Sequence, residues 1–320
     1  MKRVGVVVFV AVHLILLIAA ALLPYSPSEQ NRAIPFSAPP QLILFDDQGR
    51  LGPFVLSRKS DSNPSDGTAQ LFRVRLLDRS KDRGWVLLST ESPSGVHLLG
   101  TDRFGRDVLS RVVYAARFSL LGGVAAATLA VLVGLIVASL STVWGRAVDS
   151  FIGFLIDTIQ IMPWIFLLIA LRALLPQHLD VRAALMCTLL LTGFLAMAYP
   201  ARLARSAMKA AAQRDFVAAA VGFGATRSYV VLRHLVPFAL DRLMTHWALL
   251  APNCVMAEVL LSYFGLGAED ARPSLGNLLS DLTEAGGALE HPWMYSPVVV
   301  LVPAVLSYHL LAEALRPSRQ

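Results

Sequence analysis

The sequence predicts an all-α integral membrane protein with six transmembrane helices. Of its 320 residues, 55% are hydrophobic and only 16% are charged, against about 25% charged residues in soluble domains. The mean hydropathy is +0.59. Stretches with few or no charges reach the length of about 20 residues that crosses about 30 Å of hydrocarbon. The six stretches are Val4–Leu23, Phe118–Gly145, Phe151–Leu171, Ala183–Ala201, Leu243–Leu261 and Trp293–Ala312.

The first stretch is expected to stay in the protein as an N-terminal anchor helix, residues 1–23. Lys2 and Arg3 precede it and small residues lie near its end, as they do in a signal peptide. Its apolar run is longer than the about 7–15 residues of a signal sequence. That length favours a retained helix.

The distribution of charges predicts that both termini face the cytoplasm. If the six stretches alternate across the membrane, the short basic segments fall on one side, which the positive-inside rule makes cytoplasmic. The loop after the fifth stretch is acidic, as expected outside. The basic residues are Lys2, Arg3, Arg146, Arg202, Arg205, Lys209, Arg214, Arg227, Arg233, Arg242, Arg316 and Arg319, and the acidic ones Glu269, Asp270, Asp281, Glu284 and Glu290.

The loop between the first two stretches, residues 24–97, is expected to form a small, partly β flap outside the membrane. Short apolar runs at Leu42–Phe45, Phe54–Leu56 and Leu71–Leu76 are typical of strands. Asp46–Gly49 is a candidate hairpin turn between the first two runs. The loop contains many arginines, but long loops are exempt from the charge rule.

A charged segment, residues 98–111, precedes the second stretch. Thr101 or Asp102 is expected to cap a helix there, and the mixed composition suits a segment at the membrane surface. Ion pairs within it would form a structural elbow that holds the span, and direct substrate binding is the alternative. Surface pairs of this kind contribute about 0–1 kcal/mol. The residues expected to pair are Asp102, Arg106, Asp107 and Arg111.

Three polar residues within the apolar stretches are functional candidates. Asp157 and Gln160 lie in the third stretch and Glu258 lies in the fifth. Ionisable groups at membrane depth are costly unless they face a cavity or a partner. The alternative is that these groups lie near the membrane surface or satisfy backbone groups freed at Pro163 and Pro252.

Motifs for catalysis are missing from the sequence. It has no phosphate-binding loop of the Gly-x-x-x-x-Gly-Lys-Ser/Thr type, no His-Glu-x-x-His pair and no Gly-x-Ser-x-Gly elbow. The seven histidines are dispersed, and Cys187 and Cys254 both lie in apolar stretches. The net charge of +6 comes mainly from arginines that flank spans. We therefore expect no catalytic site, metal site, bound cofactor or nucleic-acid partner.

A basic, polar segment between Tyr199 and Leu243 interrupts the apolar stretches and is predicted to be a docking element. Phe216–Val221 is a short run of alanine, valine and phenylalanine, and Gly222 and Gly224 permit a backbone turn. A second helix is expected after the turn, ending at Pro237. Small residues on a short helix fit into a groove of another protein. The alternative is a helix that rests on anionic lipid through Arg202, Arg205, Lys209 and Arg214. Both can hold, with lipid contacts for this basic part and protein contacts for the turn.

At these residues the chain resembles the EAA loop of membrane subunits of bacterial ABC importers. Matches elsewhere are collinear, extend over roughly Leu98 to Pro317, and resemble more narrowly the dipeptide and oligopeptide permeases. The matching segments are Phe216-Val217-x-Ala219-Ala220-x-x-x-Gly224, Arg233-His234-Leu235-Val236-Pro237, Leu99-Gly100-Thr101-Asp102, Gly105–Arg111, Leu261–Gly267 and Pro273-Ser274-Leu275-Gly276.

The resemblance implies a type I importer permease domain, residues 98–317, with a cytoplasmic coupling loop at residues 200–242. It implies a bacterial inner-membrane complex with a homologous permease, two cytoplasmic ATPases that use ATP and Mg²⁺, and an external solute-binding protein. The implied coupling residues are Asp215, Phe216, Ala218, Ala219, Ala220, Gly222, Gly224, His234 and Pro237, and the translocation-path candidates are Asp157, Gln160 and Glu258.

Two positions depart from the family pattern. Ala218 stands where the loop usually has an acid, so the contact of that acid is either absent or made by Asp215 instead. Leu275 stands where tryptophan is usual. The solute is open, since related permeases carry peptides, nickel, opines or sugars. A stand-alone secondary transporter that uses Asp157 and Glu258 as an ion or proton relay is the alternative function.

Overall fold

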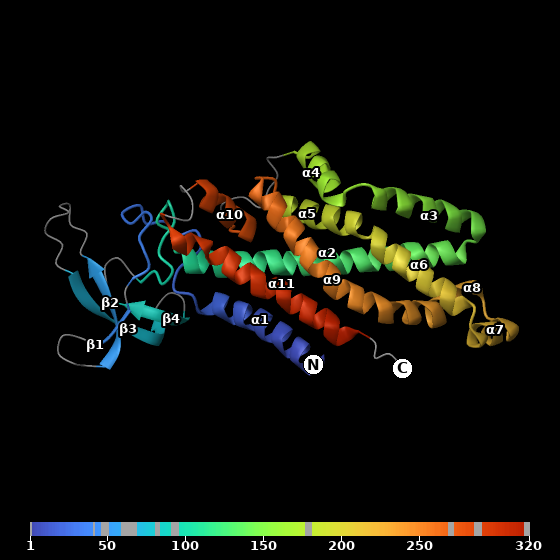
Figure 1. The fold of residues 1–320 in the computed structure, drawn as a ribbon, viewed down its shortest axis with the longest axis horizontal. Helices are drawn as coiled ribbons and strands as arrows, with labels where there is room; N and C mark the ends of the chain where they lie inside the picture. The colour runs from blue at the N-terminus through green and yellow to red at the C-terminus, as the bar shows by residue number, and fades with distance from the viewer. Residues whose placement is uncertain are drawn as a thin grey trace. The chain divides into compact units, whose positions relative to one another are not determined.

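The computed structural model describes a mostly helical chain (Figure 1). The described residues are 2–40, 42–45, 51–58, 69–80, 84–90, 96–176, 181–267, 272–284 and 290–316. The chain divides into two compact units. One consists of Met1–Ala11, Ser119–Ala268 and Ala304–Gln320, and the other of Val12–Phe118 and Glu269–Pro303.

Four helices of the described residues are long and apolar enough to cross a membrane. They are α1 (Lys2–Leu22), α2 (Val108–Val143), the run Arg227–Tyr263 that ends in α9 (Val236–Tyr263), and Pro292–Leu315, which ends in α11 (Ser296–Leu315). Two bent helix pairs raise the number to six if each pair is one span. The pairs are α3 (Arg146–Ile161) with α4 (Trp164–Leu174), and α5 (Val181–Ala196) with α6 (Ala198–Ala212).

The third and fourth predicted spans are bent helix pairs in the structure. The chain bends by 89° between α3 and α4 and by 40° between α5 and α6. Pro163 precedes α4 with an extended ψ of 98°, and a proline without an N–H interrupts the helical hydrogen bonds. A sequence window measures apolar length, so it does not detect such a change of direction.

The second helix also begins earlier than the sequence predicts. α2 starts at Val108, ten residues before the predicted start at Phe118. Its cap is neither Thr101 nor Asp102, because Asp107 Oδ2 accepts a hydrogen bond of 2.7 Å from the Ser110 amide. That bond satisfies one of the amides that a helix start leaves without a partner.

Small residues bring α6 and α9 together in the first unit, where the two helices run side by side (Figure 1). The buried face of α6 is a row of alanines, and α9 presents further small residues to the core. Without a hydrophobic drive in lipid, such close packing holds membrane helices together. The row is Ala201, Ala204, Ala207 and Ala211 on α6, and Ala239, Ala248 and Ala251 are buried on α9.

The second unit contains a four-stranded antiparallel sheet with the strand order β1-β2-β3-β4. Leu42 pairs with Val55, Phe54 with Arg73 and Val74 with Thr90 in successive strand pairs. The candidate hairpin turn at Asp46–Gly49 lies outside the described residues. The strands are β1 (Leu42–Phe45), β2 (Leu51–Arg58), β3 (Ala69–Ser80) and β4 (Gly84–Thr90).

Gly123 of α2 tests the close packing against α9. A Cβ atom at this position would lie 2.2 Å from Val255 Cγ2 and 2.8 Å from the Val255 amide nitrogen. Because backbone must shift to make room, Gly123→Ala should destabilise the protein by about 1–3 kcal/mol. A lower melting temperature of the purified protein in detergent would report this loss.

The neighbouring glycine is the matched control. A Cβ at Gly122 would meet no atom within 4 Å, so Gly122→Ala should be neutral or stabilising by up to about 1 kcal/mol. Equal melting temperatures for the two variants would contradict the packing of α2 on α9.

Candidate functional site

A glycine turn joins α7 (Asp215–Gly222) to α8 (Arg227–Val230) at one end of the α6 and α9 pair (Figure 1). Gly224 has a φ of +86°, a left-handed conformation that side chains resist. Thr226 then caps α8 by accepting a hydrogen bond from the Tyr229 amide at 3.4 Å. Gly222 is the last residue of α7, and its φ is not positive. Of the two glycines predicted to form the turn, only Gly224 therefore adopts the left-handed conformation.

The predicted helix end at Pro237 is wrong. A π-helical turn at Val231–Leu235 follows α8, and α9 continues from Val236 with Pro237 in its first turn. Pro237 has no amide hydrogen, and it closely follows the π turn without a break in the helical segment. The chain therefore runs as one long helical segment from Arg227 to Tyr263.

The segment 215–237, which contains the glycine turn, is mostly exposed and partly apolar. Phe223 is 93% exposed, and the Phe216 and Tyr229 rings each lie 5.9 Å from the His234 ring. Asp215 begins α7, and Ala218 and Ala219 are exposed on it. An open groove of about 510 Å³ is lined by Ala220, Phe223, Gly224, Ala225, Thr226, Tyr229 and His234.

The basic residues before the turn have partners within the chain. Arg205 and Lys209 on α6 bind the two oxygens of the Asp149 carboxylate at 2.5 and 2.6 Å. The Arg214 guanidinium lies 4.9 Å from the centre of the Phe238 ring. These contacts tie α3 to α6, and the start of α7 to α9.

The three path candidates lie in different surroundings. Asp157 is exposed, and its Oδ1 lies 3.7 Å from Arg202 Nη1, which also donates to Gln160 Oε1 at 2.9 Å. Glu258 is buried on α9 and accepts a hydrogen bond of 2.7 Å from Ser262. Of the three, only Gln160 lines the pocket between the bent helix pairs and α9.

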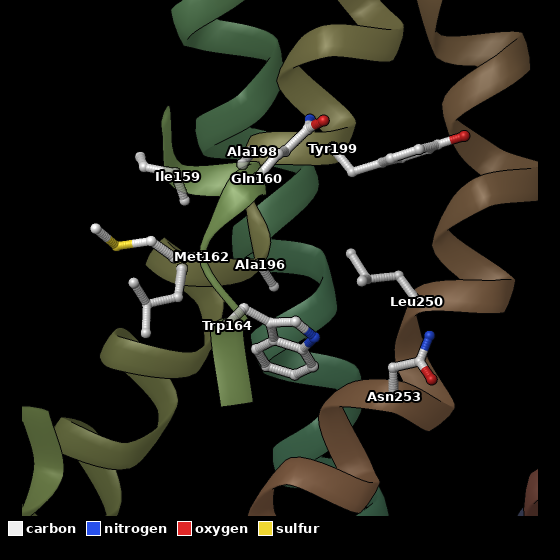
Figure 2. Close-up of a pocket in the computed structure, with 10 residues that line it drawn as sticks. Ile159, Gln160, Met162, Trp164, Ala196, Ala198, Tyr199, Leu250 and Asn253 are labelled. Carbon is white, nitrogen blue, oxygen red and sulfur yellow. The ribbon is translucent and has the colours of Figure 1, made fainter. Parts of the chain in front are cut away.

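A pocket of about 160 Å³ lies where the two bent helix pairs meet α9. Figure 2 shows Trp164 pointing toward α9, which contributes Leu250 and Asn253, while Gln160 and Tyr199 lie at the other end. The Tyr199 ring packs 4.4 Å from the His246 ring. The lining residues are Ile159, Gln160, Met162, Trp164, Leu195, Ala196, Ala198, Tyr199, Leu250 and Asn253.

The elbow in the second unit is a buried ionic cluster and not a set of surface pairs. Arg106 Nε contacts Asp102 Oδ2 at 2.6 Å, and Arg111, which is fully buried, lies 3.5 Å from the same oxygen. Asp281 on α10 (Leu275–Glu284) lies 3.1 Å from Arg103 and 3.4 Å from Arg111. Buried charges need such compensation because they have lost their hydration.

The roles of Asp281 and Asp107 differ from those that the sequence predicts. Asp107 caps α2 and contacts His97 at 3.0 Å. Asp281 appeared only as one acid of an outer loop, because it stands 170 residues from Arg111. No local spacing pattern predicts a pair so far apart in sequence.

Backbone contacts hold the elbow in shape. Asp102 Oδ1 accepts hydrogen bonds from the amides of Phe104 and Arg106 at 2.8 and 2.9 Å. Gly105 has a φ of +70° and packs against the Asn31 carbonyl, where a side chain has no room. Trp293 Nε1 donates to the Thr101 carbonyl at 3.2 Å. Backbone amides therefore help to orient the Asp102 carboxylate toward the arginines.

The chain is mostly helical, with several helices long and apolar enough to cross a membrane and an exposed glycine turn. The family model "binding-protein-dependent transport system inner membrane component" matches residues 130–320. This match covers more than half of the chain, which therefore belongs to that family of ABC importer permeases. It is a multi-pass membrane protein and a non-catalytic transport subunit, with the ATPase in separate subunits.

Known relatives agree with this assignment. The oligopeptide transport system permease protein OppC of Escherichia coli K12 is 33% identical over 238 residues, which cover 73% of this chain and 76% of that protein. OppC of Bacillus subtilis is 29% identical over 232 residues, 72% of this chain and 73% of that protein. A putative peptide permease of Brucella suis biovar 1 is 28% identical over 232 residues, with 72% and 75% covered.

A solved structure supports the fold. An inward-facing form of the MetNI methionine ABC transporter superposes with a TM-score of 0.51 at 18% identity, covering 65% of this chain and 98% of that one. At this identity the likeness concerns the fold alone.

Asp281 tests the buried ionic cluster. Its side chain is 7% exposed and contacts several arginines, so Asp281→Asn removes one of the carboxylates that compensate the buried arginines. We expect a loss of stability of about 3–5 kcal/mol, seen as a lower melting temperature and a smaller folded yield. Glu284→Gln is the control. Glu284 lies on the same helix, pairs with Arg103 and is 57% exposed, and exposed ion pairs contribute about 0–1 kcal/mol. Similar losses in both variants would argue against the cluster.

Proposed function

We propose that this chain is the permease subunit of an ATP-driven importer of oligopeptides or dipeptides. The exposed glycine turn carries the coupling part of this proposal, because a chain without a phosphate-binding loop needs a partner that hydrolyses ATP. The names of the relatives from Escherichia coli, Bacillus subtilis and Brucella suis support the peptide class.

The proposed arrangement is a six-span permease in a bacterial inner membrane with both termini in the cytoplasm. Residues 1–23 form the anchor, residues 98–317 form the permease domain, and residues 24–97, which include the four-stranded sheet, lie outside the membrane. The partners are a homologous permease, two ATPases that bind ATP and Mg²⁺, and an external solute-binding protein. The chain itself binds no cofactor in this proposal.

Docking to an ATPase depends on shape and apolar area in this proposal. Phe223, at the tip of the turn, presents an aromatic ring that nothing in the described residues buries. Aromatic anchors of this kind carry much of the energy of protein interfaces. Ala218 leaves α7 without the usual acid, and the exposed Asp215 at the helix start is the nearest replacement.

Motion of the turn would reach the pocket through rigid elements. The helical segment that starts at Arg227 continues through α9 to Leu250 and Asn253. α6, which precedes the turn, is tied to α3 through Asp149. Movement of the ATPases would thus shift α3, α6 and α9 together around the pocket, as alternating access requires.

Truncation of Phe223 tests the docking step. Because the ring is 93% exposed, Phe223→Ala should leave folding unchanged and weaken binding of the ATPase subunits about 10- to 100-fold. Co-purification of the ATPases and solute-stimulated ATP hydrolysis measure this effect. Leu174→Ala is the control, because Leu174 is also largely exposed but lies at the end of α4. Normal ATPase binding by Phe223→Ala would contradict the proposed docking face.

Gly224 tests the shape of the turn. Gly224→Val forces a β-branched residue into a left-handed conformation that costs about 1–2 kcal/mol or more. We expect membrane insertion to persist while transport and coupled ATP hydrolysis are lost. The control Gly222→Ala adds a Cβ with no atom within 4 Å at a helical position, and should insert equally well with its turn intact. Wild-type uptake by Gly224→Val would remove the glycine turn from coupling.

The transported class is tested in liposomes that contain the complete complex. Peptide uptake should need ATP and the binding protein, and the purified chain alone should not transport under an ion or proton gradient. Gradient-driven uptake by the chain alone, abolished by Asp157→Asn and Glu258→Gln, would instead establish the secondary transporter. Uptake of another solute with no peptide uptake would leave the permease role but overturn the peptide class.

A further inference from the structure

The pocket between the bent helix pairs and α9 lies at a concentration of helix irregularities. The break at Met162 and Pro163 and the break at Met197 both adjoin lining residues, and Pro252 interrupts the hydrogen bonds of α9 beside Asn253. In a membrane, broken helices are tolerated where they are buried in protein or line a cavity. In transporters, such breaks mark solute sites.

The pocket wall is neutral. Amide, phenol and indole groups stand on an otherwise apolar lining, and no carboxylate, lysine or arginine is among the lining residues. Arg202, which is not a lining residue, donates to Gln160 Oε1 at 2.9 Å and also faces Asp157. A solute group with a full charge would find no opposite charge on this wall.

The amides of Gln160 and Asn253 lie at opposite ends of the pocket (Figure 2). Arg202 occupies the Gln160 oxygen, and Gln160 Nε2 has no hydrogen-bond partner among the described residues. Asn253 uses Nδ2 to donate to the Leu249 carbonyl at 3.2 Å, which orients the side chain on α9. The pocket thus offers a donor at Gln160 and a carbonyl acceptor at Asn253.

We propose that this pocket is a subsite of the translocation path that receives an uncharged stretch of a peptide, with Gln160 and Asn253 bonding its backbone and Trp164 packing on it. The inference rests on the proposed peptide import. Sites for whole drug-sized ligands have volumes of about 300–1,000 Å³, whereas this pocket has about 160 Å³. It therefore holds about one residue of a solute.

Asn253 is the most suitable residue for a test by mutation, because its side chain is exposed and its replacement creates no cavity in the core. In the complete reconstituted transporter, Asn253→Leu removes the acceptor and should raise KM for tri- to pentaalanine about 2- to 10-fold, as for one hydrogen bond. Asn253→Asp keeps the acceptor but adds a charge to the neutral wall, and should slow transport of the same peptides further. Met256→Leu is the control, because Met256 is exposed on α9 outside the pocket.

A labelling experiment separates a solute contact from an effect on shape. In a background with Cys187→Ala and Cys254→Ala, alanine peptides should slow the reaction of a thiol reagent with Asn253→Cys, but not with Met256→Cys. If the complex transports the peptides normally, but the peptides do not protect Asn253→Cys and Asn253→Leu has an unchanged KM, the proposed subsite is overturned. The proposed peptide import would still stand. Absence of alanine-peptide transport by the wild-type complex would overturn the proposed peptide class and this inference with it.

Discussion

The need to satisfy backbone hydrogen bonds away from water governs the first unit of this protein. In hydrocarbon each unpaired backbone amide or carbonyl costs several kcal/mol. A helix satisfies these groups internally, and non-helical backbone is tolerated only where it is buried in protein or lines a cavity. The interruptions at Pro163, Met197 and Pro252 lie around one pocket. A fourth, the π turn at Val231–Leu235, lies at the start of α9 beside the glycine turn. Three of these interruptions thus adjoin the proposed solute pocket, and the fourth adjoins the glycine turn.

In the second unit the main constraint is the burial of full charges. Arg106, Arg111 and Asp102 are almost fully excluded from solvent, and Asp281 on α10 completes their compensation. A buried ion pair adds little stability relative to apolar residues, but removal of one partner is strongly destabilising. The cluster therefore fixes which segments come together, since α10 in any other place would leave the arginines uncompensated.

Helix continuity links the proposed docking face to the proposed solute pocket. Pro237 closely follows the π turn, and the helical segment from Arg227 to Tyr263 is not divided there. Asp149 joins α3 to α6 through Arg205 and Lys209. A packed set of helices passes displacement on as a unit, because close-packed interiors yield little. The apolar tip at Phe223 lies at one end of that set.

The sequence by itself determined the membrane class, the apolar helices, the Gly224 turn and the family motifs, because these follow from composition, local periodicity and short spacing. It did not determine that Pro163 bends the chain by 89° or that Pro237 leaves a helix intact. The effect of a proline depends on where it falls in a helix. Only the tertiary structure joined Asp281 to Arg111 and set Gln160 and Asn253 around one pocket. Those pairings depend on how distant helices pack, which no local pattern records.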